Sequence, residues 1–157
     1  MAMKKRVLFV CFGNTCRSPM AEAIFKKLVA EGGISDQWDV DSAGTSNWAL
    51  GSPPDNRALG CLARHGLSSN HRGRQITKSD FVECDNIFCM DTKNLSLLEQ
   101  FSKDVANTKA HILLLGSLDP HEELIISDPF SGGSREYERA YEQCHRCIQA
   151  FLRLNAA

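Results

Sequence analysis

The fold is decided by Val7-Leu8-Phe9-Val10-Cys11-Phe12-Gly13-Asn14-Thr15-Cys16-Arg17-Ser18-Pro19, close to the start of the chain. The first four residues are apolar and include β-branched side chains, which is typical of a buried strand. A loop follows from Cys11 to Ser18. Pro19 then opens a helical pattern, with Ser18 predicted as the N-cap and Pro19 as the first helical residue. The stretch therefore predicts a strand, a loop and a helix in direct succession.

The loop in this stretch has the composition of an anion site. Backbone N–H groups at a helix N-terminus lack partners within the helix, and the helix dipole adds positive potential. Gly13 allows successive amides to converge on one anion, and Arg17 supplies a planar fork that matches two phosphate oxygens. The same field favours a thiolate, so we expect a lowered pKa for Cys11 and take it as the candidate nucleophile. The alternative is a buried structural cysteine before a tight turn.

Length and composition narrow the class of protein. The chain has 157 residues, which suits one domain over residues 1–157, and its 18 basic and 19 acidic residues nearly cancel. This balance favours neither a nucleic-acid partner nor a membrane surface, and no apolar run is long enough to span a bilayer. Seven cysteines, without the spacing of a small secreted framework, indicate reduced thiols. We expect a cytoplasmic protein that is monomeric or self-associates weakly.

Strands alternate with helices along the rest of the chain, which favours an α/β fold with a parallel sheet. Strands are predicted over residues 7–10, 38–40, 85–90 and 111–115. Helices are predicted from Pro19 to the Gly32-Gly33 pair and over residues 56–65, 92–101 and 134–154. The inward face of the second helix is predicted as Ala58, Leu59, Leu62 and Ala63. Ligands of such sheets bind beyond the carboxyl ends of the strands, so we expect the site at the Cys11 loop and at the segments after residues 40 and 90 and around Asp128.

The segment from Cys11 to Pro19 resembles the signature of the low-molecular-weight protein tyrosine phosphatase family, and the resemblance covers nearly the whole chain. It implies a single α/β domain with a four-stranded, twisted, parallel, Rossmann-like sheet and helices on both faces. It also implies a phosphatase that needs no cofactor or metal and acts on phosphorylated proteins or peptides through a cysteinyl-phosphate. Besides Cys11 and Arg17, the implied phosphate-binding loop contains Phe12, Gly13, Asn14, Thr15, Cys16 and Ser18.

A second catalytic group is predicted at Asp128-Pro129-Phe130. Pro129 holds Asp128 extended, and the glycines of the following Ser131-Gly132-Gly133-Ser134 permit a mobile lid. A cysteine-dependent phosphatase needs a general acid for the leaving atom. The resemblance implies that Asp128 is this acid, and then the base for the attacking water. An ordinary Asp-Pro turn is the alternative.

Further residues are implied by their positions in the family. Asn14, Ser18, Ser42 and His71 would hold the phosphate loop through hydrogen bonds, and Ser18 would also donate to the thiolate. Asn14 is expected at a left-handed position, which asparagine tolerates. The segment 74–78 also matches the family and is interpreted as structural.

The substrate cleft is predicted to have aromatic walls. Asn47-Trp48 follows the second strand and Phe130 follows the acid, so the two rings could sandwich a planar group. Partly buried packing is the alternative for either ring. By family position, Asp91 would face the rim of the cleft, where it could attract a basic group on the substrate.

Thr15 bears on the choice of substrate. Tyrosine-specific members of the family usually carry isoleucine at this position, and members that hydrolyse phosphoarginine resemble this chain in having threonine. A hydroxyl removes methyl bulk and can accept hydrogen bonds from guanidinium N–H groups. Arginine-specific members also resemble the chain at Phe130, where many tyrosine-specific members have tyrosine. These two positions slightly favour phosphoarginine, with phosphotyrosine as the alternative.

The remaining cysteines suggest other chemistry. The resemblance implies that Cys16 forms a reversible disulfide with Cys11 under oxidation, which fits the tendency of a reactive thiolate to pair with a neighbouring thiol. Arsenate reductases on the same fold relay a disulfide to two cysteines in the region of Cys84 and Cys89, although an apolar strand around Cys89 favours burial. Cys144-His145-Arg146-Cys147 looks like half of a zinc site, but its place on a helical stripe favours core packing.

Two non-hydrolytic alternatives remain. A phosphocarrier subunit also holds a phosphocysteine on a small α/β sheet, and a phosphoprotein-binding module needs only the anion site. Neither requires both a loop arginine and a general acid. Arg17 and Asp128 therefore favour hydrolysis.

Overall fold

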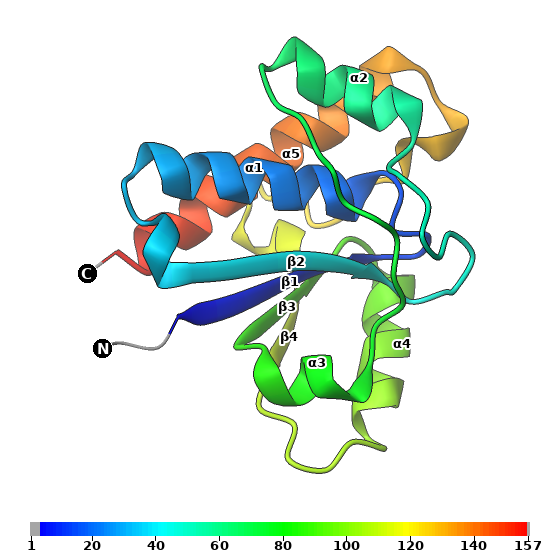
Figure 1. Cartoon of the computed structure of the whole chain (residues 1–157), viewed down its shortest axis with the longest axis vertical. Coiled ribbons are helices and arrows are strands. Elements are labelled where there is room, and N and C mark those ends of the chain that lie inside the picture. Colours follow the sequence, from blue (N-terminus) through cyan, green and yellow to red (C-terminus); the bar gives the residue numbers. More distant parts are fainter. Residues whose placement is uncertain (1–3, 157) are drawn as a thin grey trace.

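The computed structural model describes residues 4–156 and contains one four-stranded parallel sheet with the strand order β2-β1-β3-β4 (Figure 1). Its strands are β1 (Lys5–Cys11), β2 (Trp38–Gly44), β3 (Asn86–Cys89) and β4 (His111–Leu114). In the register of the sheet, Cys11 at the end of β1 pairs with Gly44 at the end of β2. The loops that follow these two strands therefore start at the same edge of the sheet.

Helices cover both faces of the sheet. They are α1 (Arg17–Glu31), α2 (Asn56–Arg64), α3 (Lys78–Glu83), α4 (Thr92–Ser102) and α5 (Ser134–Leu154), with 3-10 turns η1 (Ser35–Gln37), η2 (Leu115–Leu118) and η3 (Pro129–Ser131). In Figure 1, α1, α2 and α5 lie on one side of the sheet, and α3 and α4 lie on the other. The predicted α/β class, with a parallel sheet between helices, is confirmed.

The apolar run in β1 supplies side chains to two cores. Val7 and Phe9 belong to the cluster that contains the inward faces of α1 and α5. Leu8 and Val10 point to the opposite side and belong to the cluster that contains Phe81 of α3. Successive side chains of a strand point to opposite faces of the sheet. Because helices cover both faces here, β1 is apolar throughout this run and does not alternate between apolar and polar residues.

The start of α1 differs from the prediction. The helix begins at Arg17 with Cys16 as its N-cap, and the N–H of Met20 donates to the carbonyl of Cys16 at 3.1 Å. Ser18 is therefore not the N-cap, and Pro19 is not the first helical residue. Pro19 is the third residue of the helix and still belongs to its first turn. Backbone N–H groups of the first turn have no partner within the helix, so a proline, which lacks this group, is tolerated there. As a result, Arg17 belongs to the helix.

The inward face of α2 is also corrected. Ala58, Cys61 and Leu62 are buried, whereas Leu59 is only partly buried and Ala63 is exposed. The prediction omitted Cys61, although a free thiol packs like a small apolar side chain. Including it rotates the buried stripe away from Ala63.

One strand is longer than predicted, and one helix was not predicted. The second strand extends from Trp38 to Gly44, beyond the predicted residues 38–40, because backbone pairing with β1 continues past the polar Asp41 and Ser42. The short helix α3 is not among the predicted elements. It starts with a capping box between Thr77 and Asp80, a sequence pattern that could have identified it.

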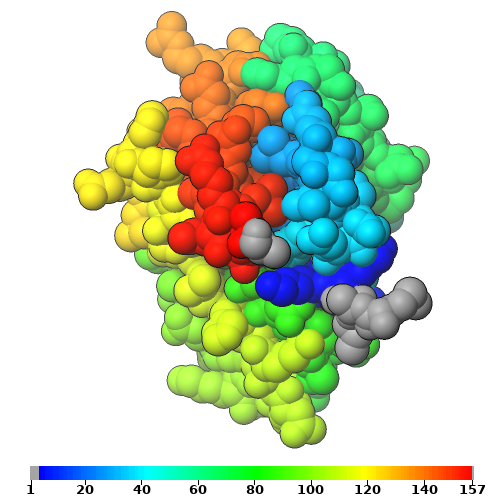
Figure 2. All heavy atoms as spheres, turned by 90° about the vertical axis from the view of Figure 1, so that its left-hand side faces the viewer, coloured from blue at the N-terminus to red at the C-terminus, as the bar shows by residue number. Residues whose placement is uncertain are grey.

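The chain ends lie away from the loops that follow the strands. In Figures 1 and 2, the start of β1 and the last turn of α5 lie side by side at the amino ends of the strands. The loops at the carboxyl ends are thus left uncovered by the termini that the structure describes. Within residues 4–156, the helices are all too short or too polar to cross a membrane.

Candidate active site

The loop between β1 and α1 directs its carbonyl groups into the protein. The carbonyls of Cys11 and Phe12 accept hydrogen bonds from the N–H groups of Thr45 and Ser46, at 3.0 and 3.1 Å. Within the described chain, the N–H groups of residues 12–16 donate to no protein acceptor. Unpaired backbone donors next to a helix N-terminus form an anion site. The local backbone thus provides the cradle that the sequence predicts.

Two positions allow the loop to curl this tightly. Asn14 has a φ of 57°, which confirms the expected left-handed conformation. Gly44 lies against the loop, and a Cβ atom there would stand 2.8 Å from the carbonyl oxygen of Phe12. A larger residue at the end of β2 would push the loop out of place.

Asn14 is the centre of the network that supports the loop. Its side-chain Nδ2 donates to the hydroxyls of Ser18 and Ser42, at 2.9 and 3.1 Å. Its Oδ1 accepts from Nε2 of His71 at 2.7 Å and from the N–H of Arg74 at 3.0 Å. The structure therefore brings together the four residues for which a supporting role is predicted.

A second set of contacts, absent from the prediction, holds this network. Glu22 of α1 accepts from Ser42 Oγ at 2.7 Å and from Lys26 at 2.7 Å, and it lies 3.2 Å from Nδ1 of His71. Burial alone would raise the pKa of the Glu22 carboxyl, but hydrogen bonds from His71, Lys26 and Ser42 lower it to about 2. An acidic residue within the buried stretch of α1 is the sequence signal that could have found it.

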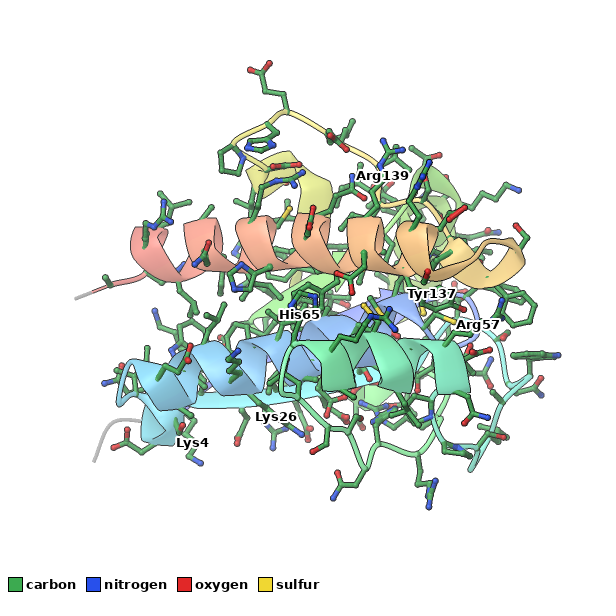
Figure 3. The ribbon with its side chains drawn as sticks, turned by 90° about the horizontal axis from the view of Figure 1, so that it is seen from above. Lys4, Lys26, Arg57, His65, Tyr137 and Arg139 are labelled. Atoms are coloured by element: carbon green, nitrogen blue, oxygen red, sulfur yellow. The ribbon has the colours of Figure 1, made fainter. Side chains whose placement is uncertain are left out.

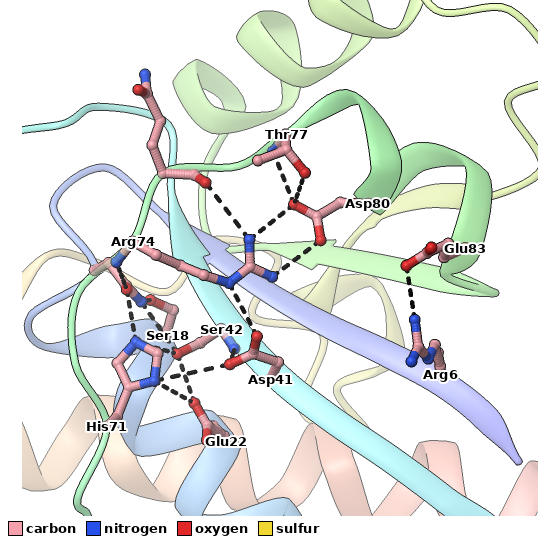
Figure 4. A network of polar contacts seen from close by, with 12 residues as sticks. Arg6, Ser18, Glu22, Asp41, Ser42, His71, Arg74, Thr77, Asp80 and Glu83 are labelled. Carbon is pink, nitrogen blue, oxygen red and sulfur yellow. Dashed lines mark hydrogen bonds and ion pairs between the residues drawn. The ribbon is translucent and has the colours of Figure 1, made fainter. Parts of the chain in front are cut away.

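Arg74 ties the same network to the other face of the sheet. Its Nε donates to Asp41 of β2 at 2.9 Å, and its two terminal nitrogens donate to Asp80 of α3, each at 2.9 Å. Figure 4 shows the guanidinium between these two carboxylates. A fork of this geometry fixes the segment that carries His71 relative to the sheet.

The sulfur of Cys11 lies at the bottom of the loop, 2.9 Å from Oγ of Ser18, and both residues are buried. Arg17 is 3% exposed, and its Nη1 donates to Oδ2 of Asp91 and to the carbonyl of Ile126, both at 2.8 Å. These two acceptors fix the orientation of the guanidinium. The thiol and the arginine predicted to act together thus lie at the two ends of one short loop.

Asp91 has a different place from the one predicted. It caps the N-terminus of α4, accepting from the N–H of Asn94 at 2.9 Å, and pairs with Arg17. Burial alone would raise the pKa of this carboxyl, but the Asn94 N–H and Arg17 hold it below its ordinary value. The carboxylate of Asp91 therefore already binds Arg17 and the Asn94 N–H, which leaves it little ability to bind a basic group on a substrate.

A pocket of about 150 Å³ opens above the loop. It is lined by Cys11, Phe12, Gly13, Thr15, Cys16, Arg17, Trp48, Asp128 and Phe130. The rings of Trp48 and Phe130 meet edge to face, with centroids 6.0 Å apart, and both are largely exposed. The two predicted aromatic walls do border the pocket, whereas Asn47 is exposed next to Trp48 and is not part of the lining.

Asp128, the N-cap of η3, lines the pocket. Its Oδ1 accepts from the N–H of Phe130 at 3.1 Å, and its Oδ2 lies 3.7 Å from Nη2 of Arg17. The side chain is 52% exposed. A half-exposed carboxyl group beside an anion cradle can transfer a proton to or from an atom bound above Cys11.

The cysteines outside the phosphate-binding loop are buried and do not line this pocket. Cys84 and Cys89 lie in the core on the α3 and α4 side, where burial raises the pKa of each thiol to about 12. Their burial argues against a disulfide relay from the loop. Cys144 and Cys147 lie on the buried face of α5, as expected for residues that pack in the core.

Two groups of side chains outside the loop have the donors of a metal site within 4.8 Å of one another: Cys61, His65 and Glu138, and Glu22, Asp41 and His71. The donors of the first group already bond to each other, with Nε2 of His65 at 2.7 Å from Oε2 of Glu138. Those of the second group belong to the network around Asn14. Both groups are explained as polar networks without an ion.

Comparisons with known proteins agree with this geometry. Residues 6–156 match the family model described as low molecular weight phosphotyrosine protein phosphatase. The human protein of that name is 53% identical over 148 residues, which is 94% of each chain. Low molecular weight phosphotyrosine protein phosphatase 2 of Drosophila melanogaster is 43% identical over 155 residues, covering 97% of this chain and 93% of that protein. The crystal structure of DARP, a Drosophila arginine phosphatase, superposes with a TM-score of 0.91 at 44% identity over 99% of both chains.

Proposed function

The chain belongs to the low molecular weight phosphotyrosine protein phosphatase family, and on that premise we propose that it hydrolyses phosphorylated protein side chains through a cysteinyl-phosphate on Cys11, with phosphoarginine slightly favoured as substrate. One observation carries the reaction type. The Cys11 sulfur lies beneath unpaired loop amides and within reach of Ser18, in a pocket that Arg17 and Asp128 also line. Phosphorylated proteins are the substrates that membership of the family implies.

In the first step, the Cys11 thiolate attacks phosphorus opposite the leaving atom. The loop amides and Arg17 hold the three equatorial oxygens and supply the positive charge that the transition state needs. The S–P bond forms as the bond from phosphorus to the side chain breaks. Asp128 gives its proton to the leaving atom, which is the guanidino nitrogen of phosphoarginine or the phenol oxygen of phosphotyrosine.

In the second step, water attacks the phosphocysteine from the side that the leaving group has vacated. Asp128, now ionised, accepts the proton of this water, and the O–P bond forms as the S–P bond breaks. Ser18 is 2.9 Å from the sulfur and can donate to the departing thiolate. The step returns Cys11 as thiolate and Asp128 as acid.

Thr15 supports the preference for phosphoarginine. It lines the pocket beside Cys11, so the position next to the phosphate carries a hydroxyl-bearing side chain instead of a larger hydrocarbon. A guanidinium has N–H donors for this hydroxyl, whereas a phenyl ring has none. The structural similarity to a Drosophila arginine phosphatase points in the same direction.

Phosphotyrosine is the second candidate substrate, and the relatives support it to the same degree. The human relative, at 53% identity, is named for phosphotyrosine. The exposed rings of Trp48 and Phe130 would hold a phenyl group as readily as a planar guanidinium.

The decisive experiment compares kcat/KM for phosphoarginine and phosphotyrosine in peptides of the same flanking sequence. We expect the wild type to favour phosphoarginine and Thr15→Ile to shift the ratio towards phosphotyrosine by about tenfold, or roughly 1.4 kcal/mol. Thr108→Ile, at an exposed position far from the loop in sequence, is the matched control. An unchanged ratio in Thr15→Ile would refute the role of Thr15 but not the phosphatase activity.

A further inference from the structure

We propose that Arg57 is a positioning residue that holds the acid loop, residues 128–132, over the phosphate-binding loop and thereby places Asp128 for proton transfer. The inference rests on the proposed role of Asp128 as the general acid. Arg57 lies in the first turn of α2 and is not part of the pocket lining. It acts through the backbone of the acid loop and does not touch the reacting atoms.

On one side, Arg57 binds the acid loop. Its Nη1 donates to the carbonyl of Phe130 at 2.7 Å and to the carbonyl of Gly132 at 3.2 Å. Its guanidinium carbon also lies 5.1 Å from the centre of the Phe130 ring. Within residues 4–156, no other side chain donates to these two carbonyls. One cation therefore binds the loop both within its turn η3 and at the end of that turn.

On the other side, Arg57 is anchored to the phosphate-binding loop through Asp55. Its Nε and Nη2 donate to the two oxygens of Asp55, at 3.0 and 3.1 Å. The backbone N–H of Asp55 donates to the carbonyl of Thr15 at 2.9 Å. The bidentate pair fixes the plane of the guanidinium, so the remaining nitrogen points at the acid loop.

The surroundings of Arg57 suit a fixed fork. Its guanidinium carbon lies 5.1 Å from the centre of the Tyr137 ring, and Tyr137 is fully buried near the start of α5. Figure 3 shows the two residues at the same end of the molecule. The Tyr137 hydroxyl in turn lies 3.3 Å from Sγ of Cys16 in the phosphate-binding loop. The guanidinium thus rests on a rigid ring instead of moving freely in water.

Asp128 depends on such an anchor because its own contacts are few. It accepts from Phe130 within the same loop, and its ion pair with Arg17 is long, at 3.7 Å. Gly132, the last residue of the loop, and Gly133 come directly before α5. A general acid must lie within hydrogen-bonding reach of the leaving atom, so a loop displaced by an ångström loses its catalysis.

The test measures kcat/KM of Arg57→Ala on two aryl phosphates. Phenyl phosphate has a basic leaving group, with a phenol pKa of about 10, and needs the acid. Dinitrophenyl phosphate has a leaving group that departs without a proton. We expect a loss on the order of 10- to 100-fold for phenyl phosphate and less than about threefold for dinitrophenyl phosphate. Affinity for inorganic phosphate should change by less than about twofold, because the cradle itself is untouched.

Three further variants make the result specific. Asp55→Asn keeps an oxygen to cap α2 but loses the ion pair, so it should show part of the same selective loss. Arg57→Lys keeps the charge without the fork and should be intermediate. Arg64→Ala, which removes an exposed arginine that binds Glu138 at the other end of α2, is the matched control and should leave both rates unchanged.

Asp128→Ala separates this inference from the proposed function. If it shows the selective loss on phenyl phosphate and Arg57→Ala adds no further loss to it, both assignments stand, since residues that act as one unit are not additive. If Asp128→Ala is selective and Arg57→Ala lowers both substrates equally or neither, the role of Arg57 is overturned. If Asp128→Ala is not selective, the proposed acid itself is wrong.

Discussion

At the scale of single residues, the proposed chemistry depends on one buried sulfur atom. Cys11 is 3% exposed and has Ser18 as its immediate hydrogen-bonding partner. The oxygen of a serine in its place would be a far poorer nucleophile at neutral pH, because a hydroxyl does not ionise there. Because serine is close to cysteine in size and can also form hydrogen bonds, the substitution should leave the loop intact.

We therefore predict that Cys11→Ser lowers turnover by roughly four orders of magnitude or more while phosphate binding remains. Steady-state kinetics and calorimetric titration with phosphate measure the two effects separately. A variant that keeps full activity would contradict the assignment of the nucleophile. A variant that loses phosphate binding as well would indicate that the loop has collapsed.

The second cysteine of the loop leads to a prediction about oxidation. Cys16 is buried, and burial raises the pKa of its thiol, so it stays protonated at neutral pH. After peroxide converts Cys11 to the sulfenic acid, the Cys16 sulfur can displace water and form a disulfide. We predict that the wild type regains most of its activity with a thiol reductant, whereas Cys16→Ser regains much less. Mass spectrometry should find the Cys11–Cys16 disulfide in the former and sulfinic acid at Cys11 in the latter.

Sequence patterns identify residues whose role is local and miss those whose role depends on distant segments. Cys11, Asn14 and Arg17 lie within one loop and could be recognised there. Arg57 could not, because its partners in the acid loop are more than seventy positions away in the chain. Asp91 is another example. The sequence places it at the rim of the cleft, because no sequence pattern shows that its carboxylate accepts a hydrogen bond from Arg17.

At the scale of elements, the ends of helices carry the site. The N-terminus of α1 forms one side of the anion cradle, and the N-cap of α4, Asp91, also orients Arg17. Helix boundaries were predicted to within one or two residues where a glycine or a long apolar stripe marks them. The start of α1, where a thiol is the N-cap, and the end of the strand β2, which runs through polar residues, were not predicted.

The double role of Asp91 can be separated by two substitutions. Asp91→Asn keeps a capping oxygen and loses the ion pair with the buried Arg17, so we predict a moderate loss of thermal stability and about tenfold weaker phosphate binding. Asp91→Ala should show the same weakening and, in addition, lose about 1 kcal/mol more of stability. Thermal unfolding and phosphate titration measure both quantities. Equal phosphate affinity in the wild type and Asp91→Asn would show that the Ile126 carbonyl orients Arg17 without Asp91.

At the scale of the whole molecule, strand and helix alternation was enough to predict the parallel sheet and the edge at which the site lies. It was not enough to predict the polar network beneath the phosphate loop. The family resemblance implies Ser42 of β2 and His71 of the segment before α3, but Glu22 of α1, which contacts both, is found only in the packed fold. The network joins three elements on which the shape of the loop depends.

This network should make stability depend on pH in a defined window. The Glu22 carboxyl has a pKa of about 2 in the folded protein against 4.5 as its ordinary value. A lowered pKa in the folded state means that the unfolded chain binds more protons between these values. The stabilisation is therefore complete above about pH 4.5 and is lost as the pH falls towards 2, and it amounts to about 3 kcal/mol at neutral pH.

We predict that Glu22→Gln is less stable than the wild type at pH 7 and loses less stability than the wild type between pH 4.5 and pH 2. Urea unfolding at several pH values across this window gives both free energies. Glu31→Gln, at an exposed position at the end of the same helix, is the control and should follow the wild type. Parallel curves for Glu22→Gln and the wild type would mean that other carboxylates carry the pH dependence. In that case the hydrogen bonds of Glu22 would hold the loop without coupling its stability to protons.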